Sequence, residues 1–364
     1  MSPHFRSVLA SAAVLALLGL LWASPAQAGR CSYLPEFPAA LRFSVPITGT
    51  ITVGRDLPIG AEIYRRSFST TRDFTVACDR AAYTYNRAYS ATPYPLSSYT
   101  HPTYGARIYT TAVPGIGAAV LIGPGTTALP VQNAVDYSAA PGNPRISLFA
   151  DTQYILVLFK TAATVGAGSI QGSGLPSPWF NVQGDNRLDL LQAQFTGQIN
   201  IVSRTCSTPD VPVNLGTHPM TALAGVGTGT AWVDVPVRLN NCPAFHARSL
   251  SGTYNDRGQA TQGGVANTLQ YRVDPVTAIV NAAQSVMALQ PDGVNQTATG
   301  IGIQVGTGTL VPVGFGTPRN AGLPLNQVDG SSYTLLLKAR YYQTGATPTS
   351  GQANGAATIT LVYQ

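Results

Sequence analysis

The sequence has few charged residues and few histidines, and it lacks the motifs on which many enzymes depend. Of its 364 residues, 10% are charged and four are histidines, and the formal net charge is +6. No basic run could neutralise successive phosphates, which argues against a nucleic-acid partner. The motifs G-x-S-x-G, H-E-x-x-H and C-x-x-C do not occur, so no enzyme, cofactor or metal site is predicted. A carboxylate pair such as Asp136 and Asp151 leaves a secreted glycosidase as the enzymatic alternative.

Long apolar runs are missing except near the N-terminus. There an apolar segment at 8–22 follows Arg6, Ser24-Pro25 ends it, and residues 26–28 supply the small side chains that cleavage requires. This pattern predicts a signal peptide over residues 1–28 and an exported, soluble mature chain beginning at Gly29. A membrane anchor is the weaker alternative, because the apolar segment is shorter than the roughly 20 residues that a span needs.

Cysteine is scarce, with only Cys31, Cys78, Cys206 and Cys242 present. All four follow the predicted cleavage site, as expected for a protein of an oxidising compartment. Four cysteines allow three pairings. We predict the two local ones, Cys31 with Cys78 and Cys206 with Cys242, because each closes a loop within one half of the chain. A metal site is disfavoured, since no histidine stands at the required spacing from a cysteine.

Glycine, proline and β-branched residues are abundant, with 37 glycines and 27 prolines separating short runs of alternating apolar residues. This pattern predicts an all-β protein of two β-sandwich domains, at 29–202 and 203–364. The expected strands lie at 41–45, 49–53, 74–78, 118–122, 154–159 and 190–202, and then at 211–215, 232–239, 268–273, 277–280, 302–305, 333–342 and 357–364. Two long segments between them, 81–109 and 161–186, are predicted to be loops with a functional role.

The last eight residues keep the strand pattern to the end, with apolar side chains at Ala357, Ile359, Leu361 and Tyr363. Period-two alternation indicates one buried face, and a final strand is expected at a sheet edge with open backbone groups. We therefore predict that this strand can pair with another polypeptide. The alternative is that it pairs within a complete sandwich.

Several features of the second half occur together. Cys206 precedes its first predicted strand and Cys242 follows the second, Thr344-Gly345 follows the strand at 333–342, Gly351 is fourteenth from the end and Tyr363 is penultimate. In these features, residues 203–364 resemble the pilin domain of two-domain tip adhesins from bacterial chaperone/usher fimbriae, a family that includes the mannose-binding type 1 fimbrial adhesin. The first half resembles the adhesin domains of this family only loosely, at 146–159 and 191–201.

The resemblance implies a lectin-like adhesin sandwich followed by an immunoglobulin-like pilin sandwich that lacks its last strand. A periplasmic chaperone and then an adjacent fimbrial subunit would donate that strand, and an outer-membrane usher would export the protein to the fimbrial tip at the cell surface. The residues that the resemblance assigns to chaperone binding and assembly are Gly351, Ala357, Ile359, Leu361, Tyr363 and Gln364. Mannose binding is not implied, because Phe159 is followed by residues unlike the family's polar pocket.

The candidate receptor-binding residues are aromatic and polar. Six tyrosines fall between residues 83 and 104, interleaved with prolines. Tyrosine offers a flat ring for a sugar and a hydroxyl for hydrogen bonds, so Tyr94, Tyr99 and Tyr104 are predicted to bind a glycan; the alternative is that they pack beneath the loop. Trp179, Asp185 and Asn186 form a second candidate, with a structural plug as the alternative. A host protein as the ligand, or a structural subunit without a receptor, remains open.

Overall fold

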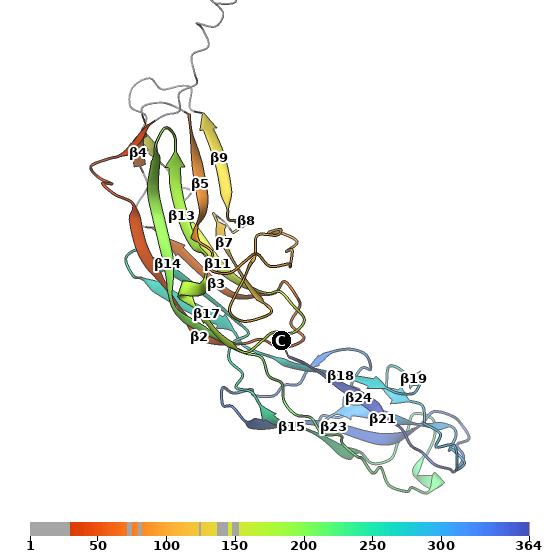
Figure 1. Ribbon diagram of the computed structural model, residues 1–364. Coiled ribbons are helices and arrows are strands. Elements are labelled where there is room, and N and C mark those ends of the chain that lie inside the picture. The colour runs from red at the N-terminus through yellow and green to blue at the C-terminus, as the bar shows by residue number, and fades with distance from the viewer. Residues whose placement is uncertain are drawn as a thin grey trace, which may run out of the picture.

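The computed structural model describes residues 30–70, 75–78, 82–123, 125–136, 145–147 and 153–363. The predicted signal peptide, Asp151 and Gln364 lie outside these residues. The chain forms two β-sandwiches arranged end to end, and the end of the described chain lies at their junction (Figure 1). The predicted all-β, two-sandwich fold is confirmed.

The first sandwich is built from two large sheets. One has the order β17-β16-β3-β11-β7-β6, with β8 paired to β7, and the other has the order β12-β14-β13-β5-β9, with β2 paired in parallel to β14. A small third sheet, β1-β4-β10, lies at the end far from the junction. The bounds are β1 (Cys31–Tyr33), β2 (Leu41–Thr52), β3 (Glu62–Ser69), β4 (Thr75–Cys78), β5 (Ala82–Ala91), β6 (Tyr109–Thr110), β7 (Ile116–Ile122), β8 (Thr127–Ala128), β9 (Val131–Asp136), β10 (Arg145–Ser147), β11 (Gln153–Lys160), β12 (Gly168–Gln171), β13 (Ser177–Gln183), β14 (Arg187–Val202), β16 (Ser249–Asn255) and β17 (Ala260–Val265).

The core of this sandwich lies between the two large sheets. Phe68 stacks on Tyr154 at a centroid distance of 5.6 Å and meets Phe195 edge to face at 5.6 Å, so β3, β11 and β14 are joined through aromatic rings. On the opposite face of β11, Ile155, Val157 and Phe159 belong to a second buried cluster. Tyr99 and Tyr104, from the loop at 92–108, pack against that cluster. β11 is therefore buried on both faces, as its uninterrupted apolar sequence requires.

The second sandwich packs the sheet β15-β23-β21-β20-β19 against the sheet β22-β18-β24. Its core includes Leu239, Tyr271, Leu337 and Val273, all buried. The bounds are β15 (Val233–Cys242), β18 (Leu269–Pro275), β19 (Ile279–Asn281), β20 (Val286–Met287), β21 (Ile301–Thr307), β22 (Arg319–Asn320), β23 (Ser331–Gln343) and β24 (Ala357–Tyr363).

The disulfides are Cys31–Cys78, which joins β1 to β4, and Cys206–Cys242, which closes a loop at the start of the second half. This is the pairing that local loop closure predicts. The two bonds span 47 and 36 residues of sequence. Each half of the chain is thus cross-linked within itself.

A hairpin from the second half of the sequence belongs to the first sandwich. β16 pairs in parallel with β3 over Leu250–Asn255 and Tyr64–Ser69, and β17 pairs with β16 at the outer edge (Figure 1). Leu250 is buried in the core of the first sandwich. The predicted domain boundary at 202/203 stays a prediction. In the structure, the hairpin β16–β17 lies after this boundary in the sequence but belongs to a sheet of the first sandwich.

Three expectations about local structure were wrong, and two elements were missed. Segment 211–215 is not a strand, although Val211, Val213 and Leu215 alternate with exposed residues. The predicted loop 81–109 contains β5, and the predicted loop 161–186 contains β12 and β13. β3 was missed because Arg65-Arg66 interrupts its apolar pattern, yet Arg66 is buried. The hairpin β16–β17 was missed because β17 is exposed along its whole length and carries no periodic signal.

Candidate functional site

The tyrosine-rich loop at 92–108 folds onto the outer face of β11. His101 stacks on Tyr104 with ring centroids 4.6 Å apart and lies 5.0 Å from Phe159. The Tyr104 hydroxyl donates to the Gly125 carbonyl at 3.2 Å. Tyr99 lies 6.2 Å from His101, ring centroid to ring centroid. The structure thus brings Tyr99 and Tyr104 together around His101, with both rings half-buried by contacts within the chain.

Tyr94 lies apart from this aromatic cluster. Its half-buried ring packs close to Gly174, in the short 3-10 turn between β12 and β13. The three tyrosines of the first predicted site therefore do not converge on one pocket. Their role in receptor binding stays a prediction.

The second predicted site is also divided. Trp179 lies in the middle of β13, where the Arg187 guanidinium lies 4.9 Å from the centre of its ring. Asp185 is exposed in the turn between β13 and β14. The Asn186 side chain accepts a hydrogen bond from the Cys31 amide at 2.9 Å and donates to the Cys31 carbonyl at 2.8 Å. Asn186 therefore holds β1 against the sandwich by two hydrogen bonds. It lies in the turn after β13, whereas Trp179 lies in the middle of that strand.

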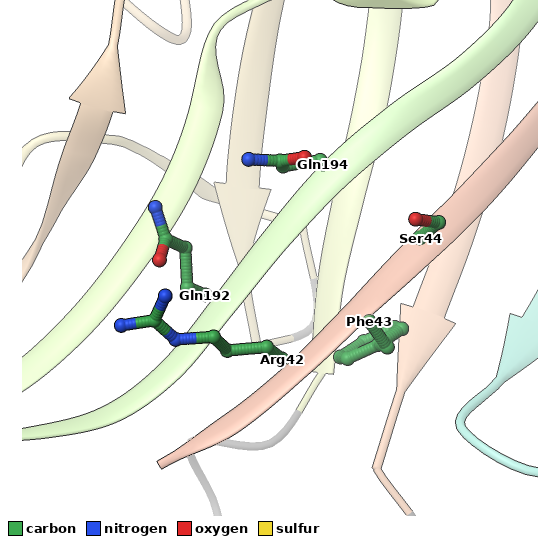
Figure 2. A pocket seen from close by; sticks show the side chains of 5 residues that line it. All are labelled: Arg42, Phe43, Ser44, Gln192 and Gln194. Atoms are coloured by element: carbon green, nitrogen blue, oxygen red, sulfur yellow. The ribbon is translucent and has the colours of Figure 1, made fainter.

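Strand register places further polar residues beside Trp179. Trp179 pairs with Gln192 on β14, and Gln192 pairs with Arg42 on β2, so the three side chains form one row on the outer face of the sheet. A shallow hollow of about 300 Å³ lies over this row and the next, lined by Arg42, Phe43, Ser44, Gln192 and Gln194 (Figure 2). Prediction from sequence missed Arg42 and the two glutamines. The sequence does indicate a polar outer face for the two glutamines, because amide and apolar residues alternate along 190–198.

A larger groove of about 690 Å³ runs through the second sandwich. Its apolar lining comes from both sheets, and the segment 208–215 lies along it. β24 pairs only with β18 among the described residues. β15 pairs with β23 and otherwise makes one isolated bridge, from Asn240 to Ser207, so most of its second edge is free among the same residues. The apolar residues that line it include Val237, Val273, Ile303, Val305, Leu337 and Ala339.

The residues predicted for assembly are placed in three ways. Ala357, Ile359 and Leu361 line the groove. Tyr363 instead stacks on Phe245, with centroids 6.0 Å apart and planes 10° apart, and burial raises the pKa of its hydroxyl. Gly351 is packed so tightly that a Cβ would lie 2.5 Å from the Ala298 nitrogen.

The junction between the sandwiches contains a buried cation. Lys160, at the end of β11, is 1% exposed, and its ammonium donates to the backbone carbonyls of Gly54 and Arg55. Burial lowers the pKa of Lys160, and the Asp56 carboxylate partly opposes this effect. A Cβ on Gly54 would lie 2.2 Å from the Tyr363 carbonyl oxygen. The end of β24 is therefore in close contact with the first half of the chain.

Across the described parts of the chain, His, Cys, Asp and Glu side chains nowhere form a group of three that could hold a metal ion. Within the same residues, no helix is long and apolar enough to cross a membrane. Asp136 lies on β9, whereas Asp151 falls outside the described residues. The arrangement as a whole offers binding surfaces, namely a polar sheet face, an aromatic loop and an apolar groove.

Comparison with known proteins gives two matches that together span residues 47–364. Residues 193–364 match the fimbrial protein family, and residues 47–198 match the MrkD-like receptor binding domain. A fimbria adhesin protein of Klebsiella pneumoniae is 26% identical over 321 residues, covering 86% of this chain and 89% of the relative. The fimbrial subunit type 1 of Salmonella typhimurium is 29% identical over 157 residues, covering 43% of this chain and 71% of the relative.

Two solved structures are similar at low identity. The receptor binding domain of the adhesin MrkD1P of Klebsiella pneumoniae is 21% identical with a TM-score of 0.35, covering 49% of this chain and 98% of that one. The CupB6 tip adhesin of Pseudomonas aeruginosa is 16% identical with a TM-score of 0.34, covering 92% and 94%. On the two family matches, the protein belongs to the fimbrial adhesins, with a MrkD-like receptor-binding domain followed by a fimbrial domain.

Proposed function

We propose that this fimbrial adhesin stands at the tip of a chaperone/usher fimbria and attaches the cell to a host surface receptor, a glycan. The first half binds the receptor, through a surface that includes some of the predicted aromatic and polar residues. The second half receives a strand from a periplasmic chaperone and then from the adjacent subunit, after passage through an outer-membrane usher. The protein acts by binding and carries out no catalysis.

The observation that carries this proposal is the apolar groove between β15 and β24. Side chains from both sheets, among them Ile303, Val305, Leu337 and Ile359, line it. Among the described residues, β24 has no second neighbouring strand, and the second edge of β15 is paired only at the isolated bridge of Asn240 with Ser207. A sandwich with a core open to solvent and two free edges is suited to accept an extended segment that buries alternate apolar side chains and pairs its backbone with the edge strands.

The experiment for this half uses the mature chain and a synthetic extended peptide with alternating apolar residues. We expect the peptide to raise the melting temperature of the chain, because it binds only the folded sandwich. Ile359→Lys places a charge in the groove and should abolish the increase. Val294→Lys is the matched control, since Val294 is 87% exposed and outside the groove. An equal increase in both variants would show that the peptide binds elsewhere.

The experiment for the first half is binding of the mature chain to a glycan array, combined with adhesion of cells that carry or lack the protein. Glycan binding together with loss of adhesion in the deletion strain supports the proposal. Binding to a host protein with no glycan hit would replace the glycan by a protein receptor. Unchanged adhesion after deletion would favour a structural subunit without a receptor.

A further inference from the structure

The outer face of the sheet β2-β14-β13-β5 has an unusual composition for a solvent-exposed surface. Such faces ordinarily carry charged side chains of both signs. Here the outward positions of β14 from residue 192 onward are Gln192, Gln194, Thr196, Gln198 and Asn200, with no lysine or glutamate among them. An amide donates and accepts hydrogen bonds at once, which suits the adjacent hydroxyls of a saccharide.

Trp179 supplies the aromatic element of this face. It is half-buried on β13 and lies directly beside Gln192, its partner in the strand register. A half-exposed indole beside amide groups can stack on the apolar side of a sugar ring while the amides bind its hydroxyls. Arg187 borders the indole, with its guanidinium 4.9 Å from the ring centre.

The charge on this face comes mainly from two arginines. Arg187 pairs with Asp189, at 3.2 Å between Nε and Oδ1. Arg42 makes no ion pair or side-chain hydrogen bond with the described residues, and its side chain extends beside Gln192 into the solvent over the hollow (Figure 2). Arg42 and Trp179 are two strand spacings apart, about 10 Å. The face therefore carries one uncompensated positive charge within reach of a ligand that lies on Trp179.

A further observation comes from the next row of the sheet, where Asn181 lies between Asn86 and Asp189. Asn181 accepts a hydrogen bond from the Asn86 side chain at 3.1 Å. Its own amide nitrogen is buried and has no acceptor among the described residues. A buried donor without a partner requires an explanation, and a bound oxygen-rich molecule or water would satisfy it.

We propose that this face, defined by Trp179, Arg187, Gln192, Gln194 and Arg42, binds an anionic saccharide. The sugar ring stacks on Trp179, the two glutamines bind its hydroxyls, and a carboxylate or sulfate pairs with Arg42 through charge-assisted hydrogen bonds. This inference rests on the proposed function and assigns its receptor chemistry. It places the receptor on the side of the first sandwich, away from the aromatic loop.

The test compares saccharides that differ in charge, using the mature chain. Sialyllactose is measured against lactose for a carboxylate, and a heparin oligosaccharide against its desulfated, reduced-charge counterpart for a sulfate. We expect binding to one charged member to exceed binding to its counterpart and to weaken with added salt. Arg42→Gln should weaken it about tenfold, the loss of one charge-assisted contact. Trp179→Ala should weaken binding to both members of that pair.

Arg257→Gln is the matched control, because Arg257 is exposed in the turn between β16 and β17, on another sheet. Its affinity should equal that of the unaltered chain, and all variants should keep the same melting temperature. Equal affinity in Arg42→Gln and the unaltered chain would overturn the assignment, as would failure to bind any charged saccharide. If another glycan or a host protein bound equally well to both variants, the adhesin function would stand and this site would be wrong.

Discussion

Arg66 should hold the β16–β17 hairpin onto the first sandwich. Arg66 is 3% exposed, and its Nη1 donates to the carbonyls of Thr253 at 3.2 Å and Thr261 at 2.9 Å. Gly252 makes this approach possible, since a Cβ there would lie 2.7 Å from the same nitrogen. One side chain from β3 thus reaches across β16 and binds both strands of a hairpin nearly 190 residues further along the chain.

Arg66→Met keeps a similar length and removes the donors. The change removes two hydrogen bonds donated by a charged group, worth about 1.5–3 kcal/mol each. It also relieves the cost of burying a charge, which offsets part of that loss. We expect a net loss of about 2–4 kcal/mol in the free energy that holds the hairpin in place.

The assay is native-state hydrogen exchange of the β16 amides, because a chain of two sandwiches need not unfold in one step. A loss of this size should speed their exchange by about 30-fold to 1,000-fold. Arg257→Met, an exposed substitution at the hairpin turn, should change it little. Equal protection of β16 in Arg66→Met and the unaltered chain would refute the reasoning.

Three further predictions concern stability. Replacing Cys206 and Cys242 by serine should cost about 3–4 kcal/mol in thermal or urea unfolding, because their bond closes a 36-residue loop. Burial raises the pKa of Tyr271 in the folded chain. As the pH rises above about 10, the unfolded chain therefore loses this proton first, and the stability of the folded chain falls. Tyr271→Phe should make that fall less steep in melting temperatures measured over a series of pH values. Asn186→Ala should cost about 1–2 kcal/mol by losing both bonds to Cys31, measured by urea unfolding, and lost glycan binding at unchanged stability would instead support the ligand role predicted for Asn186.

The sequence predicted strands well where burial follows a period of two or is continuous. β11 and β24 were expected almost at their observed bounds, because their apolar pattern is unbroken. β3 also buries alternate residues, but Arg66 occupies a core-facing position whose partners come from β16 and β17. No local pattern can indicate that a buried arginine is satisfied by a distant hairpin. The parallel pairing of β16 with β3 is equally a result of tertiary structure.

The candidate site was predicted by residue type and not by position. The tyrosine-rich segment includes the loop at 92–108, and the direction of Tyr99 and Tyr104 follows from β11, whose outer face this loop covers. The signal was present in the sequence: the run at 154–159 is apolar at both parities, so something must pack on each face. Gln192 and Arg42 required the register of β2 on β14, which is set by pairing between segments 150 residues apart.

The end of β24 links the groove to the first sandwich, and Gly54 is the position that tests this link. Gly54 is buried, and a Cβ there would lie 2.2 Å from the Tyr363 carbonyl oxygen and 2.8 Å from its carbonyl carbon. Backbone atoms cannot rotate away as a side chain does, so Gly54→Ala should displace the end of β24 and cost about 1–3 kcal/mol. Because Ile359 and Leu361 on the same strand line the groove, the displacement should also reduce the stabilisation that a groove-binding peptide provides. Gly263→Ala is the control, since the nearest atom to its Cβ would be 3.8 Å away. If Gly54→Ala matched this control in both melting temperature and peptide response, the strand end would not carry the contact between the two sandwiches.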